Sequence, residues 1–83
     1  PNPFNSGTTI RFSLISPTDV SLSICDLLGR QVRRIDRPGL NAGARQIHWD
    51  GRDESGRDLP SGVYFYTLLA GAQTARAKML MVR

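Results

Sequence analysis

Residues 62–82 read GVYFYTLLAGAQTARAKMLMV, two apolar runs joined by Ala70-Gly71-Ala72-Gln73. Glycine adopts the positive φ that a tight hairpin turn requires, so the joint is typical of a turn between paired strands. The stretch therefore predicts strands over 62–70 and 73–82 that form a hairpin. In the second strand, alternation separates two faces, Ala75, Ala77, Met79 and Met81 on one and Arg76, Lys78, Leu80 and Val82 on the other.

The same period of two continues toward the start of the chain. Apolar and polar residues alternate over 10–14, 20–25 and 45–49, and less regularly over 31–36, which predicts four further half-buried strands. Turn residues recur about every 8–12 positions, the spacing found in sandwiches and barrels. No stretch has the apolar stripe of a helix. We therefore predict an all-β antiparallel sandwich with six evident strands and room for a seventh within 36–43 or 50–60.

The length of 83 residues predicts a single domain over 1–83. A chain this short buries only about 60–65% of its unfolded surface, which leaves little core around a deep substrate pocket. No run approaches the length of a membrane-spanning helix, and no signal peptide stands at residue 1. The chain starts at Pro1 without an initiator Met, and residues 1–6 are expected to be a linker-like start. We interpret it as a piece of a larger protein.

Nothing in the sequence predicts catalysis. Cys25 is the only cysteine, which excludes an internal disulfide, and a lone Cys in a strand is more often packed than reactive. A thiol–imidazole pair with His48 is therefore disfavoured. The sequence has no phosphate-binding glycine loop, no nucleophile elbow and no Cys/His metal spacing. We predict that the module is not an enzyme and uses no cofactor.

The net charge of +4 comes from eleven basic residues, of which Lys78 is the only lysine. They are scattered apart from Arg33, Arg34 and Arg37, and no zinc-finger or aromatic single-strand motif accompanies them. We predict no nucleic-acid partner. Solvated strand faces are the favoured interpretation, and weak attraction to an anionic glycan or lipopolysaccharide is the alternative.

The densest polar stretch is residues 50–58, DGRDESGRD. Clustered carboxylates on a glycine-containing loop can bind Ca²⁺, but the spacing does not fit an EF-hand and two arginines are interleaved. We predict two consecutive tight turns in which Asp side chains accept hydrogen bonds from nearby backbone amides. A weak Ca²⁺ site is the alternative, with the candidate ligands Asp50, Asp53, Glu54 and Asp58.

Three aromatic residues could contact a glycan. Trp49 shares its parity with Ile47, so a core position is favoured over a sugar-stacking platform, and His48 is expected to face solvent. Tyr64 and Tyr66 share one strand face and could form a glycan-binding strip, although tyrosine is also an ordinary strand residue.

Motifs along the whole chain, in a fixed order, resemble those of FlgD-type immunoglobulin-like domains and of the related C-terminal sorting domains of the type IX secretion system. They are Pro1-Asn2-Pro3-Phe4-Asn5, Thr9-Ile10-Arg11-Phe12, Val20-Ser21-Leu22, Asp26, Gly29-Arg30-Gln31-Val32, Gly43, Trp49-Asp50-Gly51-Arg52-Asp53, Gly56, Pro60-Ser61-Gly62-Val63-Tyr64, Gly71 and Lys78 to Arg83.

This resemblance implies a seven-stranded immunoglobulin-like sandwich that serves as a non-catalytic C-terminal module of a large exported bacterial protein. In the sorting branch, the export machinery recognises the folded module, which can be removed when the protein is attached to surface lipopolysaccharide. The resemblance therefore implies a secreted or cell-surface location. The Trp49–Asp53 stretch is more typical of the hook-cap branch, which keeps a structural role open.

The resemblance also implies the partners. We expect a monomer that contacts the secretion and sorting machinery or adjacent domains of its parent protein. Lys78 and Arg83 are the recognition candidates, and we expect both charges to be exposed and to contribute little to stability. A structural spacer or assembly module and a carbohydrate-binding module of a secreted hydrolase are the alternatives.

Overall fold

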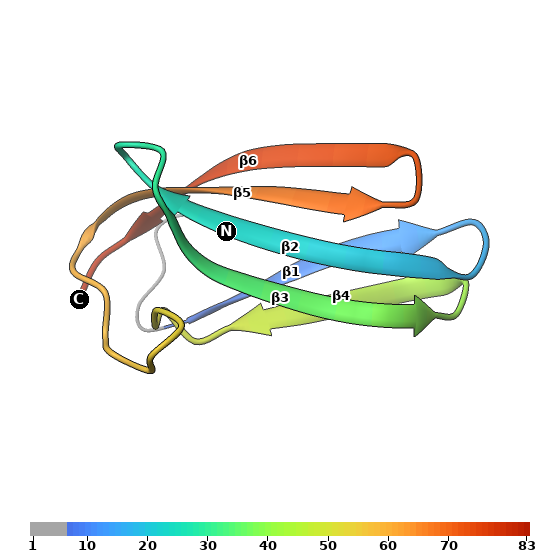
Figure 1. The fold of residues 1–83 in the computed structure, drawn as a ribbon, viewed down its shortest axis with the longest axis horizontal. Coiled ribbons are helices and arrows are strands. Elements are labelled where there is room, and N and C mark those ends of the chain that lie inside the picture. Colours follow the sequence, from blue (N-terminus) through green and yellow to red (C-terminus); the bar gives the residue numbers. More distant parts are fainter. Residues whose placement is uncertain (1–6) are drawn as a thin grey trace.

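A computed structural model of the chain describes residues 7–83. All the strand pairs within this part are antiparallel, and it contains no helix that could span a membrane. The strands are β1 (Thr8–Leu14), β2 (Thr18–Asp26), β3 (Gln31–Leu40), β4 (Gly43–Trp49), β5 (Gly62–Ala70) and β6 (Gln73–Met81). One sheet has the order β1-β4 and the other β3-β2-β5-β6, which confirms the predicted sandwich (Figure 1).

Residues 7–83 hold six strands rather than the seven expected. Residues 36–43, one of the two stretches with room for a seventh strand, instead lengthen β3 to Leu40. There the Asp19 carboxylate accepts a hydrogen bond from the Gly39 amide at 2.8 Å. Residues 50–60, the other stretch, form only an isolated bridge between Arg52 and Asp58. The linker-like start predicted over 1–6 lies outside the described residues.

The core follows the alternation of the strands. Trp49 and Met81 are completely buried and Ile47 is 2% exposed, which confirms the predicted parity of β4 and β6. The Trp49 ring meets the Tyr64 ring edge-on, with centroids 5.7 Å apart, and its Nε1–H donates to the Arg52 carbonyl at 3.0 Å. A large apolar side chain buried in this way stabilises the fold by about 1.5–3 kcal/mol.

The connections gather at two opposite ends of the sandwich (Figure 1). One end carries the β1–β2 connection and the β5–β6 hairpin turn, in which Gly71 has φ 60° as predicted. The other end carries the β2–β3 turn and residues 50–61 between β4 and β5. We call this second end the loop end. It holds the polar residues singled out from the sequence.

Candidate functional site: a groove between two matching turns

The β2–β3 turn is organised by one carboxylate. Oδ1 of Asp26 accepts the amides of Leu28 and Arg30, both at 3.0 Å. The Gly29 amide donates to the Asp26 carbonyl at 2.9 Å, and Gly29 takes φ 82°, which a glycine adopts without strain. The bond from the Gly29 amide to the Asp26 carbonyl and the positive φ of Gly29 are typical of a type I turn with a following bulge.

A second turn, within the 50–58 loop, repeats this arrangement. Oδ1 of Asp53 accepts the amides of Ser55 at 2.9 Å and Arg57 at 3.0 Å. The Gly56 amide donates to the Asp53 carbonyl at 3.0 Å, and Gly56 takes φ 85°. The prediction of a tight turn with an Asp side chain bonded to nearby amides is therefore confirmed at Asp53–Arg57.

The two turns share the sequence pattern Asp-x-x-Gly-Arg, at 26–30 and 53–57. In both, the arginine Nε also donates to the second carboxylate oxygen of the turn's aspartate, at 2.8 Å in the first and 3.4 Å in the second. We call them the twin turns. Strand alternation does not relate these two stretches of the sequence. The repeated five-residue pattern is the sequence signal that does.

Hydrogen bonding favours the charged form of both aspartates. For Asp53, the Arg57 amide, then the Ser55 hydroxyl, hold the pKa below its ordinary value of 3.8. For Asp26, desolvation raises the pKa, but the Arg30 amide and guanidinium and the Leu28 amide outweigh it and lower the pKa from 3.8. Both turns are therefore built for an ionised carboxylate.

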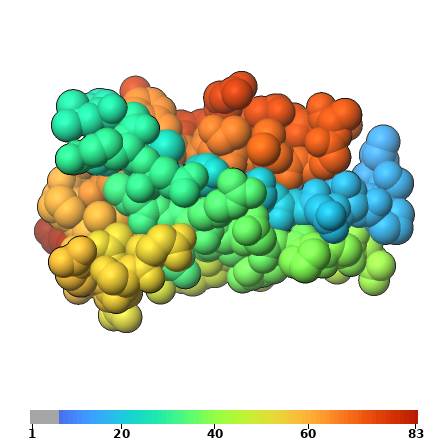
Figure 2. All heavy atoms as spheres, in the orientation of Figure 1, coloured from blue at the N-terminus to red at the C-terminus, as the bar shows by residue number. Residues whose placement is uncertain are grey.

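The twin turns form opposite walls of a groove of about 710 Å³. Figure 2 shows the β2–β3 turn and the 50–61 segment side by side at the loop end of this face. The apolar side chains that line the groove between the walls include Val32, Leu59, Pro60 and Val63. An apolar concavity with a few placed polar groups is the usual form of a binding site.

Two leucines stand exposed on one wall. Leu27 is 68% exposed and Leu28 is 76% exposed, although the turn needs no apolar residue at either position. The guanidiniums of Arg30 and Arg57 stand on opposite walls, 73% and 81% exposed. The groove thus combines apolar contacts with two exposed guanidiniums, each paired with the aspartate of its own turn, which suits recognition of a partner surface rather than catalysis.

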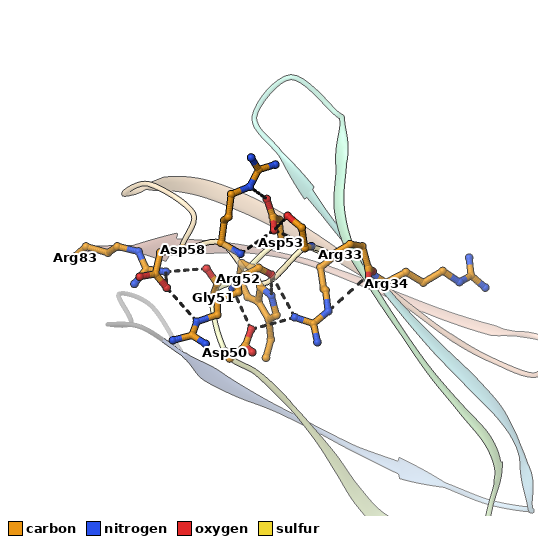
Figure 3. Close-up of polar contacts among 12 residues, drawn as sticks. Arg33, Arg34, Asp50, Gly51, Arg52, Asp53, Asp58 and Arg83 are labelled. Atoms are coloured by element: carbon orange, nitrogen blue, oxygen red, sulfur yellow. Dashed lines mark hydrogen bonds and ion pairs between the residues drawn. The ribbon is translucent and has the colours of Figure 1, made fainter.

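The rest of the loop is fastened to β3 (Figure 3). Arg33 donates to the Asp50 carboxylate at 3.1 Å and to the Arg52 carbonyl at 3.4 Å. One residue further along β3, the Arg34 amide donates to Glu54 at 2.5 Å. The wall that carries the second twin turn is therefore held in place by several bonds.

Arg83 ties the end of the chain to the same loop (Figure 3). Its guanidinium donates to the carbonyls of Gly51, at 2.7 Å, and of Leu59, and its amide donates to the Ser61 hydroxyl at 2.9 Å. Because its side chain is only 26% exposed, the expectation of a freely exposed Arg83 charge is wrong. Lys78 lies on β6 with an exposed side chain.

The structure rules out one of the two tyrosines on β5 that were the alternative for glycan binding. Tyr64 is 3% exposed and its hydroxyl donates to the Pro60 carbonyl at 2.7 Å, so it cannot offer a ring face to a sugar. Burial raises its pKa above 10.0. The cause is the inward parity of Tyr64, which packs it on Trp49. Tyr66 is half-buried beside β1 and β6.

The candidate Ca²⁺ ligands are committed to other partners. Asp53 and Glu54 accept the backbone amides described above. Asp50 accepts hydrogen bonds from the Arg33 guanidinium and the Arg52 amide. Asp58 accepts one from the Arg52 guanidinium at 3.1 Å. Over the described residues, no three Asp, Glu, His or Cys side chains converge as metal ligands.

The two residues weighed as a thiol–imidazole pair lie apart. Cys25 is half-buried on β2, in the four-stranded sheet, and His48 is exposed on β4, in the other sheet. The His48 Nδ1 lies 3.1 Å from the Thr9 hydroxyl. The predicted solvent-facing position of His48 is confirmed.

Comparison with known proteins agrees with this architecture. The family model described as "FlgD Ig-like domain" matches residues 2–75. FlgD from P. aeruginosa is 25% identical, with a TM-score of 0.72 over 87% of this chain and 58% of that one. FlgD from Xanthomonas campestris, whose structure is described as giving insights into the hook capping essential for flagellar assembly, is 25% identical, with a TM-score of 0.71 over 90% of this chain and 55% of that one.

A third structure is similar in fold. Dimeric latent PorU from Porphyromonas gingivalis is 24% identical, with a TM-score of 0.81 over 99% of this chain and 9% of that one. None of the curated proteins matches the chain. In each of the three structures the chain spans only part of the matched protein, from 9% to 58% of its length.

Proposed function

This chain belongs to the FlgD Ig-like domain family, and from that membership we propose that it is a non-catalytic module of a larger exported bacterial protein. In this proposal, the machinery that sorts the parent protein to the cell surface recognises the module in its folded form.

One observation carries this proposal, the groove between the twin turns. Its two walls come from residues 26–30 and 53–57, which approach each other only after β2, β3 and the loop have folded. A partner that binds this groove would therefore bind the folded module and not the unfolded chain. Preorganised walls reduce the ordering cost of binding, and the exposed pair Leu27 and Leu28 supplies apolar contact area.

The proposal is tested by fusing residues 1–83 to a secreted reporter with an export signal in the native host. We expect the fusion to reach the cell surface and the reporter alone to remain periplasmic. A fusion carrying Trp49→Ala, which destroys the core, should lose surface delivery if the folded form is what is recognised.

A structural spacer is the competing function, because the loop end could equally pack on an adjacent domain of the parent. It predicts that the reporter stays periplasmic with and without the module. Surface delivery of the unfolded Trp49→Ala fusion would contradict recognition of the folded form and would favour a linear signal.

A further inference from the structure

The first half of β6 lies exposed at the outer margin of its sheet. In the order β3-β2-β5-β6, β6 closes one side of the four-stranded sheet within residues 7–83 (Figure 1). The half of β6 over Gln73–Ala77 is the more accessible half, since its first four residues are all exposed. Exposed sheet margins are templates for a further strand.

The register of the hairpin identifies which groups point to that margin. The two-residue turn makes Ala70 and Gln73 its first hydrogen-bonded pair, and such pairs alternate along β5 and β6. Ala75 and Ala77 therefore face β5 with their backbone groups, whereas the N–H and C=O groups of Thr74 and Arg76 point outward. These groups can form a ladder with an added strand.

The side chains next to this margin alternate in chemistry. Arg76 projects on the outer face of the sheet, while Ala75 and Ala77 take the inward parity of Met79. Ala77 lines a shallow hollow of about 350 Å³ together with Ile10 and Tyr66. The small alanines thus leave room for apolar side chains on the inner face.

The charged side chains of β5 and β6 have one sign. Residues 59–83 contain no Asp or Glu, while they contain Arg76, Lys78 and Arg83. On the other side of the same hollow, β1 contributes Arg11. A second copy of this chain would place Arg76 near its own equivalent, whereas an acidic segment would be attracted.

We propose that the margin of β6 over Gln73–Ala77 binds an extended acidic segment of a partner protein, which adds to the sheet as a further strand. Its residues alternate, with carboxylates beside Arg76 on the outer face and apolar side chains over Ala75 and Ala77 on the inner face. The inference concerns binding by the chain itself and does not rest on an export role.

The test is a fluorescence anisotropy titration of the 83-residue chain with a labelled peptide of alternating Val and Asp. The same peptide with Lys in place of Asp should not bind. Arg76→Glu should weaken binding of the Asp peptide about tenfold or more, because it reverses the charge beside the carboxylates. The matched control Arg37→Glu makes the same charge change on β3, at the opposite margin of the sheet, and should change affinity less than about twofold.

A second arm tests the backbone ladder. Thr74→Pro removes an outward N–H without removing a bond to β5 and should abolish binding. The Asp peptide with N-methylated amides should also fail to bind, and this arm needs no change in the protein. Binding of the N-methylated peptide, or equal weakening by Arg76→Glu and Arg37→Glu, would reveal a general attraction to polyanions and overturn the proposal.

Discussion

Asp26 and Asp53 stand on opposite walls of one groove and organise their turns by the same set of hydrogen bonds. Each carboxylate fixes two backbone amides and an arginine of its own turn. The shape of the groove therefore depends on two ionised side chains, and this dependence is measurable.

The twin turns predict a loss of stability in acid. Both aspartates have a folded-state pKa below 3.8, so their contribution is complete above that pH and is lost as the pH falls through the folded-state values. Asp26→Asn and Asp53→Asn keep an accepting oxygen but cannot ionise. Thermal melts are recorded between pH 5 and pH 2 in steps of about one pH unit. Over this range the Tm of the double variant should decline less steeply than the Tm of the unsubstituted chain. Parallel declines would contradict a role for the charged carboxylates.

Trp49 should be the most costly core residue to truncate. Trp49→Ala removes a fully buried ring and should destabilise the fold by about 3–5 kcal/mol, enough to unfold a marginal domain. Trp49→Phe keeps an aromatic edge for Tyr64 and should cost less in urea unfolding. A red-shifted, freely quenched tryptophan fluorescence in the native chain would show that the ring is exposed instead.

Arg83 should stabilise the loop end. Arg83→Gln breaks its guanidinium bonds to the Gly51 and Leu59 carbonyls and should lower the free energy of unfolding by about 1–2 kcal/mol. Arg76→Gln, at an exposed position of β6, is the matched control and should leave Tm nearly unchanged. If both variants melt alike in calorimetry, the tie at Arg83 contributes nothing measurable.

The 50–58 loop should not respond to Ca²⁺. Its carboxylates already bind amides and guanidiniums, so thermal melts in millimolar Ca²⁺ and in EDTA should nearly coincide. An increase of several degrees with Ca²⁺ would demonstrate linked binding and would restore the metal-site alternative.

Alternation along the chain was enough to predict the sandwich, the buried Trp49 and the β5–β6 hairpin, because a period of two fixes which side chains face the core. Alternation alone left a seventh strand over 50–60 open. The clustered aspartates of 50–58 predicted turns there instead, because their carboxylates compete with a strand ladder for backbone amides. The partners of Arg83 lie up to 32 residues away along the chain, and no local pattern reports such contacts. The groove needed the fold as well, because its walls come from separate turns.

Recognition through the groove between the twin turns is tested most directly by the exposed leucines. Leu27→Ser with Leu28→Ser removes apolar contact area from one wall, while Ile15→Ser changes a side chain that is 90% exposed in the β1–β2 connection at the opposite end. Both variants should keep Tm within about 3 °C of the unsubstituted chain. With the module fused to the secreted reporter, surface delivery should fall severalfold for the double leucine variant and remain normal for Ile15→Ser. Normal delivery of the folded double variant would contradict recognition through this groove.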